Sequence, residues 1–240
     1  MRIFVAGGTG VIGRVLVPML VAAGHDVTGT TRSAEHAQRL TAQGARPVIV
    51  DVYDANALRS AVLAARPEVV AHQLTDLAGG FSPDDLARNA RLRRIGTANL
   101  VAAAEAAGAR RLIAQSIAWL YADGPLPHDE THPLRTPTDA PSDESLRGIL
   151  ELERLVLESG AFEGIVLRYG ALYGPGSGAD EADAPIPRVS VDGGARRPPG
   201  RGARRVGDLQ RGRRQRPGQQ RPRPARAGVA TLSDTAPPHR

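Results

Sequence analysis

Three glycines near the start of the chain, Gly7, Gly10 and Gly13, have the spacing of a turn that binds phosphate groups. They follow an apolar run at residues 3–6, which predicts a buried strand, and precede residues 11–23, where apolar residues recur at helical spacing. In such a unit the first glycine permits a tight turn, the second lets the backbone approach a pyrophosphate, and the third lets the helix lie close to the strand. The N–H groups at the start of the helix then favour an anion. The alternative is a purely structural glycine turn.

We therefore predict a dinucleotide at this turn. The residues expected to contact it there are Gly7, Thr9, Gly10, Val11, Ile12 and Gly13. Its adenosine ribose should face the end of the second strand, which is followed by Arg32. An acidic residue there would bond the 2′-hydroxyl of NAD, whereas an arginine accommodates the 2′-phosphate of NADP. Arg32, with Arg14 as a second contact, favours NADP, with NAD as the alternative. The other interpretation of Arg32 is a solvent-exposed residue in the first turn of the next helix.

Two further strand ends carry residues that could meet the same ligand. Asp51 and Val52 end the third strand, where Asp51 is placed to bond the adenine amino group; its alternative role is to cap the following helix. His72 and Gln73 end the fourth strand, at the point where the strand order of a dinucleotide-binding sheet reverses. We predict that all four bind the cofactor, while a lone histidine at such a place is more often structural.

Strand-like and helix-like segments alternate along the first 178 residues. The predicted strands are 3–6, 25–30, 46–50, 68–72, 110–116 and 165–168. The predicted helices are 11–23, 33–43, 54–65, 83–107 and 142–159. This alternation predicts an α/β fold, a Rossmann-type doubly wound parallel sheet with helices on both faces. The predicted division is a nucleotide-binding domain at 1–178, a remnant of a substrate lobe at 179–192 and a disordered basic tail at 193–240.

The composition narrows the classes of function. The chain has no cysteine, which excludes disulfides and thiolate metal sites, and no metal site is predicted. It shows no signal peptide and no apolar stretch long enough to span a bilayer, so a cytoplasmic protein without a membrane partner is expected. Residues 188–240 hold 14 Arg and 3 acidic residues, whereas residues 1–187 hold 17 Arg and 22 acidic residues. Because the body is mildly acidic, the net charge of +6 does not indicate a body that binds nucleic acid.

Several motifs together resemble the NAD(P)-dependent epimerase/dehydratase family, the extended short-chain dehydrogenase/reductase group. They are residues 7–13, 51–52, 96–100, 116, 167–176 and 188–192. The resemblance covers roughly residues 1–192. It implies an enzyme that transfers a hydride between nicotinamide C4 and a carbon bearing oxygen, on an unknown small carbonyl or nucleotide-sugar-like substrate. It also implies a homodimer formed through helices 83–107 and 142–159.

The family's catalytic set of Ser, Tyr and Lys is only partly present. Ser116 matches the serine that holds the substrate oxygen. The Tyr-x-x-x-Lys motif should lie around residues 143–149, but that stretch has no tyrosine and the whole chain has no lysine. A phenol with a pKa of about 10 needs a nearby cation to act as a base near neutral pH. Tyr121 is the best remaining phenol and Arg147 a source of charge, although an arginine has a different reach from a lysine. The alternative for Tyr121 is a packed aromatic residue beside the loop at residues 125–141, whose length predicts a flap near a site.

Three functions therefore remain open. The first is an oxidoreductase or epimerase that uses Ser116 with Tyr121 as a substitute acid. The second is a non-catalytic NADP-binding sensor, since cofactor binding needs no proton relay, and the third is an inactive truncated homologue. The missing relay favours the last two, whereas Ser116 and the glycine-rich loop at 169–176 favour the first.

After residue 192 the sequence changes character. Residues 193–226 are dominated by Arg, Gly, Pro and Gln and are too polar to bury a core. One hypothesis is that the family's C-terminal lobe is translated here in a shifted frame. With suitable codons, residues 209–211 and 227–232 read one base later give Tyr-Asn-Val and Leu-Gly-Trp-Arg-Pro-Ser, as the family's pattern implies. The alternative is a genuine basic arm that contacts phosphates without sequence specificity, because it has no aromatic residue for base stacking.

Overall fold

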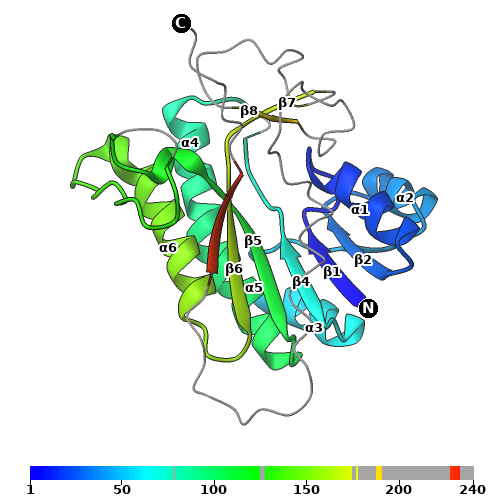
Figure 1. The fold of residues 1–240 in the computed structure, drawn as a ribbon. Helices are drawn as coiled ribbons and strands as arrows, with labels where there is room; N and C mark the ends of the chain where they lie inside the picture. Colours follow the sequence, from blue (N-terminus) through cyan, green and yellow to red (C-terminus); the bar gives the residue numbers. More distant parts are fainter. Residues whose placement is uncertain (78, 125–127, 175–176, 178–187, 191–227, 233–240) are drawn as a thin grey trace, which may run out of the picture.

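The computed structural model of the chain describes residues 1–77, 79–124, 128–174, 177, 188–190 and 228–232. Its centre is a seven-stranded sheet in the order β3-β2-β1-β4-β5-β6-β9, in which every neighbouring pair is parallel (Figure 1). The strands are β1 (Arg2–Ala6), β2 (Asp26–Thr31), β3 (Arg46–Ile49), β4 (Val69–His72), β5 (Arg111–Ile117), β6 (Glu163–Tyr169) and β9 (Gly228–Leu232). This order confirms the predicted doubly wound α/β fold.

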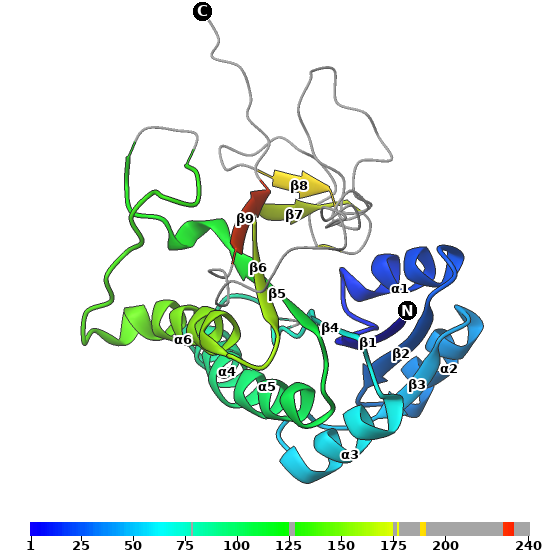
Figure 2. The ribbon, with the colours of Figure 1, turned by 60° about the horizontal axis from the view of Figure 1, so that its bottom comes forward.

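Helices cover both faces of the sheet (Figure 2). The α-helices are α1 (Gly13–Ala22), α2 (Ala34–Ala42), α3 (Ala55–Ala65), α4 (Pro83–Arg91), α5 (Thr97–Ala106) and α6 (Glu144–Glu158). On one face, Val5 of β1 packs with Val17 of α1 and Leu40 of α2. On the other, Phe4 of β1 belongs to the larger core that also contains Leu100 of α5. Because β1 is buried on both sides, its sequence is a continuous apolar run. Among the described helices, none is long and apolar enough to cross a membrane.

The predicted helix at 83–107 forms as three consecutive helical segments. α4 begins with a capping box, in which Ser82 Oγ accepts from the Asp85 N–H at 3.2 Å and Asp85 Oδ2 accepts from the Ser82 N–H at 3.0 Å. A π-helical turn, Leu92–Gly96, then joins α4 to α5. Such turns occur often at functional sites, and this one carries the buried Arg93.

Three short strands follow the last predicted one. β7 (Ala171–Tyr173) and β8 (Arg188–Ser190) pair in parallel beyond the carboxyl end of β6 (Figure 1). β9 pairs with β6 from Ile165↔Gly228 to Tyr169↔Leu232. The sequence predicts disorder throughout 193–240, and β9 differs from that prediction at 228–232. The rest of the predicted tail lies outside the described residues, so the domain division stays a prediction.

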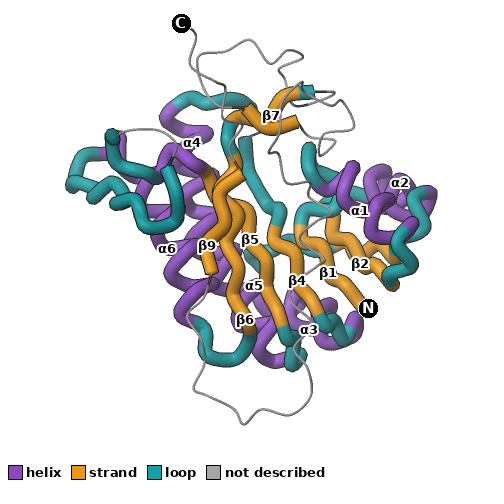
Figure 3. The backbone as a smooth tube through the Cα atoms, viewed as in Figure 1, coloured by secondary structure: helices purple, strands orange, loops and turns teal. Residues whose placement is uncertain are grey.

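The strands of the large sheet lie side by side (Figure 3), and because every neighbouring pair is parallel, their carboxyl ends share one edge. The glycine turn leaves this edge after β1, and His72 and Gln73 lie at it after β4. β1 and β4 are neighbours, and the strand order reverses between them. In open sheets of this kind the ligand binds in the crevice at that point. The candidate site is therefore built from the residues that follow the strands.

Candidate functional site

The glycine turn holds β1 and α1 so close together that two of its glycines have no room for a side chain. A Cβ on Gly13 would lie 2.2 Å from the Gly7 carbonyl oxygen. Gly7 has a φ of +87°, and a Cβ there would lie 2.8 Å from the Gln73 carbonyl oxygen. Gly10 differs, because among the described residues its Cβ would meet only the Gly7 oxygen, at 3.5 Å. Gly7 and Gly13 therefore serve the turn and the helix packing, whereas the protein leaves the surface at Gly10 open.

The start of α1 supplies donors to that open surface. The first N–H groups of a helix have no acceptor within the helix, and at α1 no side chain caps them and no acidic residue occupies the first turn. The backbone of Val11, Ile12 and Gly13 is thus suited to an anion at the positive end of the helix dipole. The half-buried Thr9 lies in the same turn, and the Gly7 N–H donates to Thr30 Oγ1 at 3.0 Å, which fixes the turn to β2.

The residues predicted to contact adenosine follow the neighbouring strands β2 and β3. Arg32 is exposed directly after β2, and Asp51 is exposed shortly after β3. Asp51 Oδ1 accepts from the Tyr53 N–H at 2.9 Å. The cap of α3 is Asp54, whose carboxylate accepts from the Ala57 N–H at 2.9 Å. Asp51 is therefore not the cap of α3, and its contact with adenine stays a prediction.

The motif at 96–100 joins the ends of β3 and β4. Asn99 Nδ2 donates to the Val52 carbonyl oxygen at 2.9 Å. The Thr97 hydroxyl is hydrogen-bonded to His72 Nε2 at 2.8 Å. Gly96 lets the helix approach, since a Cβ there would lie 3.1 Å from Val52 Cγ1. Sequence reasoning identified this motif without its role, which is to hold two strand ends of the site in place.

His72, predicted to bind the cofactor, is engaged within the protein. Its Nδ1 accepts from the Leu74 N–H at 3.3 Å, so the ring proton lies on Nε2 and is donated to Thr97. Burial, reinforced by the charge of Arg93, lowers the pKa of His72 to about 4. The ring is therefore neutral near pH 7 and both its nitrogens have partners. This geometry does not support the predicted contact of the His72 side chain with a cofactor and favours a structural role.

Gln73, unlike His72, has a buried polar atom that lacks a partner among the described residues. It is 7% exposed, and its Oε1 has no hydrogen-bond partner among the residues that the structure describes. Leaving such an acceptor unpaired costs about 1–3 kcal/mol. Burial raises the pKa of Tyr169 to about 12, although a hydrogen bond from the Gln73 side chain acts to lower it. Tyr169 is therefore a neutral phenol. Gln73 directly follows β4, at the point where the strand order reverses, so a ligand N–H or O–H group bound there would give Oε1 a partner.

Ser116, the predicted catalytic serine, lies inside a buried polar network. It is 1% exposed, and its hydroxyl donates to Glu153 Oε1 at 2.6 Å. Arg168 pairs with both oxygens of the same carboxylate, at 2.9 and 2.6 Å. The network joins β5, α6 and β6, and it does not support a contact between Ser116 and a substrate oxygen. Sequence reasoning missed Glu153 and Arg168; the available signal was an acidic residue within the apolar stripe of one helix and a cation in an apolar strand.

Tyr121, the predicted substitute acid, is buried in a cluster of rings. The guanidinium carbon of Arg168 lies 4.8 Å from its ring centroid. His128 and His132 meet the ring edge-on, with centroids 5.2 and 5.9 Å away, and stack on each other at 3.9 Å. These contacts match the alternative of a packed aromatic residue beside the flap. A catalytic role for Tyr121 stays a prediction.

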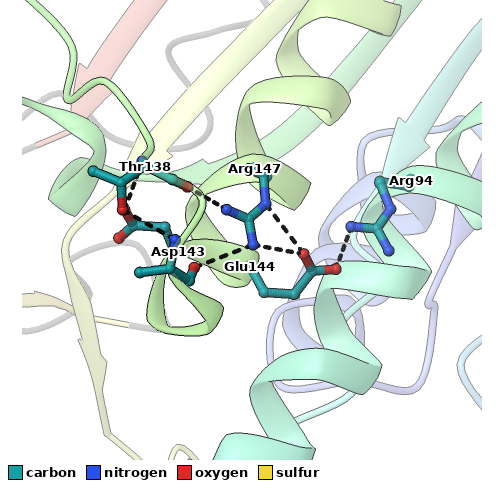
Figure 4. A network of polar contacts seen from close by, with 6 residues as sticks. Arg94, Thr138, Asp143, Glu144 and Arg147 are labelled. Carbon is teal, nitrogen blue, oxygen red and sulfur yellow. Dashed lines mark hydrogen bonds and ion pairs between the residues drawn. The ribbon is translucent and has the colours of Figure 1, made fainter.

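The stretch where Tyr-x-x-x-Lys was expected forms the start of α6 and is fastened by ion pairs (Figure 4). Glu144 pairs with both Arg94 and Arg147. Arg147 also donates to the carbonyl oxygens of Thr138 and Ala140 in the preceding loop. The charge of Arg147 thus ties this loop to α6, so it does not serve as the cation beside a catalytic phenol.

Among the described residues, neither a metal site nor the groove between α5 and α6 forms part of the candidate site. Within the described ranges, no group of three or more His, Asp or Glu side chains is arranged to hold a metal ion. A groove of about 390 Å³ lies between α5 and α6, with a lining that runs from Ala98 to Ser159. It follows the outer faces of the two helices toward the end of α6, away from the carboxyl edge of the sheet. The groove is therefore separate from the crevice between β1 and β4.

Comparison with known proteins agrees with this geometry. The model of the NAD dependent epimerase/dehydratase family matches residues 3–195, so the match ends where the sequence changes character. A 3-diazoavenalumate denitrifying reductase from a Streptomyces species is 52% identical over 184 residues, which are 74% of this chain and 58% of that protein. The 4-hydroxy-2-methyl-3-oxo-4-farnesyl-3,4-dihydroquinoline-1-oxide ketoreductase of Stigmatella aurantiaca is 36% identical over 136 residues, 56% of this chain and 39% of that protein.

A solved structure shares the fold. The Bordetella bronchiseptica enzyme WbmG, in complex with NAD and UDP, is similar with a TM-score of 0.59 and 25% identity over 73% of this chain and 55% of WbmG. The chain thus spans less than two thirds of the length of each of these relatives. The family match confirms the resemblance found in the sequence motifs.

Proposed function

The chain belongs to the NAD dependent epimerase/dehydratase family, and from this premise we propose that it is an NAD(P)H-dependent reductase. Gly10 and the start of α1 would hold the pyrophosphate, Arg32 and Asp51 the adenosine, and Gln73 after β4 the nicotinamide half. The open surface at Gly10 and the unpaired Gln73 Oε1 support this placement. Arg32 supports NADP as the preferred dinucleotide.

The absence of the Tyr-x-x-x-Lys pair limits which reductions the protein could catalyse. Reduction of a carbonyl adds a hydride to carbon and a proton to oxygen, and the second step needs an acid. This chain has no lysine. In the stretch where the Tyr-x-x-x-Lys pair was expected, Glu144 and Arg147 form an ion pair, and Ile149 lies in an apolar cluster with Leu120 and Leu146. The absence of the Tyr-x-x-x-Lys pair from a chain that keeps the dinucleotide turn is the observation that carries the proposal. We expect a substrate whose reduction needs a hydride and no proton from the enzyme.

A carbon that carries a diazonium group meets this requirement. A bound reduced nicotinamide would supply the hydride for the new C–H bond, and the C–N bond of the diazonium would break with its electron pair leaving on N₂. Atoms and electrons balance without a proton, and the dinucleotide becomes oxidised. The 52% identical relative is named as a reductase that denitrifies a diazo compound, and the name of that compound has the form of an acid anion. We therefore propose a diazonium derivative of an organic acid as the substrate class.

A non-catalytic dinucleotide sensor is the second candidate, because the same missing relay leaves cofactor binding intact. The carbonyl and nucleotide-sugar substrates that the sequence predicts rank below both. Their chemistry needs Ser116 or Tyr121 to exchange a proton, and both side chains are buried among partners within the protein. The ketoreductase relative and WbmG are the support for that class.

A matched pair of substrates tests the proposal. The full chain is first titrated with NADPH and NADH. NADPH oxidation is then followed by absorbance with para-carboxybenzenediazonium and with para-carboxybenzaldehyde, which differ only in the reacting group. We expect turnover of the diazonium with one N₂ released per NADPH, above the rate of chemical reduction measured without protein. Turnover of the aldehyde alone contradicts the proposal, and tight binding without turnover of either compound supports the sensor.

A further inference from the structure

Two arginines, Arg93 and Arg168, are only 3% exposed, but they have different partners. Arg168 is paired with Glu153. Arg93 makes no ion pair or side-chain hydrogen bond with any residue in the described part of the chain. Burial lowers the pKa of Arg93 to about 10, with no acidic group near enough to oppose that shift. Arg93 is therefore still charged at neutral pH, and no counter-ion for it lies among the residues that the structure describes.

The neighbours of Arg93 along the helix fix its place in the site. Asn89, four residues earlier, accepts with Oδ1 from the Asp76 N–H at 2.8 Å. Thr97, four residues later, is bonded to His72. Both contacts reach the segment that begins at the end of β4, so Arg93 lies next to this segment, on the inner side of the π-helical turn. The lowered pKa of His72 agrees, because the charge of Arg93 contributes to it.

A buried guanidinium without a counter-ion opposes folding, so a chain that keeps one needs a use for it. We propose that Arg93 binds the carboxylate of the substrate beside the nicotinamide half of the dinucleotide. The planar guanidinium matches the two oxygens of a carboxylate. The side chains that flank it in this cluster, Asn89, Thr97 and the neutral His72, add no positive charge, which suits a single negative charge better than a phosphate dianion. This assignment rests on the proposed function, since it takes the substrate to be an organic acid that binds at the end of β4.

Arg93→Met tests the assignment, because methionine keeps an extended chain and removes the charge. In the full chain without ligands, we expect the Tm of Arg93→Met to equal or exceed that of the unchanged protein. The matched control is Arg168→Met, at a position of equal exposure, where loss of the cation leaves Glu153 unpaired and lowers the Tm. A structural role for Arg93 predicts the opposite, a lowered Tm in both variants.

Binding is measured by calorimetry with benzoate, benzamide and inorganic phosphate, with and without saturating NADPH. The unchanged protein should bind benzoate at least tenfold more tightly than benzamide, and Arg93→Met should lose this difference while Arg93→Lys keeps part of it. NADPH affinity should be the same in all three proteins.

The proposal is overturned by equal benzoate affinity in the unchanged protein and Arg93→Met, by no binding of benzoate at all, or by phosphate binding more tightly than benzoate. If NADPH does not bind, the proposed function fails separately, and the titrations without NADPH still decide the role of Arg93.

Discussion

Gly10→Ala separates ligand binding from folding in one substitution. The Cβ it adds would have a single neighbour within 4 Å, the Gly7 carbonyl oxygen at 3.5 Å, which is an ordinary contact. Gly10 is exposed, and its φ lies outside the left-handed region that disfavours alanine. The free energy of unfolding should therefore be unchanged or increase by up to about 1 kcal/mol, since alanine restricts the unfolded chain.

The cost should appear when the dinucleotide binds. The added methyl occupies the surface over which the pyrophosphate approaches the backbone at the start of α1. Loss of one charge-assisted hydrogen bond from that N–H array costs about 1.5–3 kcal/mol. At about 1.4 kcal/mol per factor of ten, the Kd for NADPH should rise roughly 10- to 150-fold.

Calorimetric titration with NADPH, together with chemical denaturation of the same samples, measures both effects. Gly13→Ala is the contrasting variant, because its Cβ would lie 2.2 Å from the Gly7 oxygen and should destabilise the fold itself. The proposed pyrophosphate site at Gly10 is wrong if Gly10→Ala binds NADPH as tightly as the unchanged protein, because the pyrophosphate would then lie elsewhere.

Three further substitutions test other parts of the site. Glu153→Gln leaves the buried Arg168 without its counter-ion and should lower the free energy of unfolding, measured by denaturant, by about 3–5 kcal/mol; a loss below about 1 kcal/mol would show that the pair is not needed. Arg32→Ala should weaken NADPH binding roughly tenfold or more and leave NADH binding unchanged, and equal losses for both would contradict a contact with the 2′-phosphate. His72 has a folded pKa of about 4 against an ordinary value of 6.5, so between these values the unfolded state binds more protons. Stability should therefore be complete above pH 6.5 and fall by about 3 kcal/mol as the pH drops toward 4, and denaturation at a series of pH values should show a shallower fall in His72→Asn.

The sequence was sufficient for the parts of the molecule that depend on local pattern. The glycine turn could be found because its three glycines stand between an apolar run and a helical period. The observed strand β5 at Arg111–Ile117 differs from its predicted range by one residue at each end. β6 is longer than predicted, because Glu163 and Gly164 continue the pairing with β5 although they interrupt the apolar run.

The side-chain partners within the site could not be predicted, because they come from elements far apart in the chain. The Ser116 hydroxyl bonds to a carboxylate 37 residues later, so its position in a family motif does not reveal that it faces α6. Arg147 appeared to be a source of charge for a phenol, but its contacts with the loop at Thr138 depend on how that loop folds back. The isolation of Arg93 is visible only once the helix and the end of β4 are placed together.

Transfer of deuterium from the cofactor is the most direct test of hydride transfer by this protein. The full chain is incubated with NADPH deuterated at both C4 positions and with para-carboxybenzenediazonium, and the benzoate formed is analysed by mass spectrometry and NMR. We expect one deuterium on the carbon that had carried nitrogen, one N₂ per NADPH consumed, and a rate above the background measured without protein. Benzoate that carries hydrogen from solvent at that carbon, or a rate equal to that background, would contradict hydride transfer by this protein.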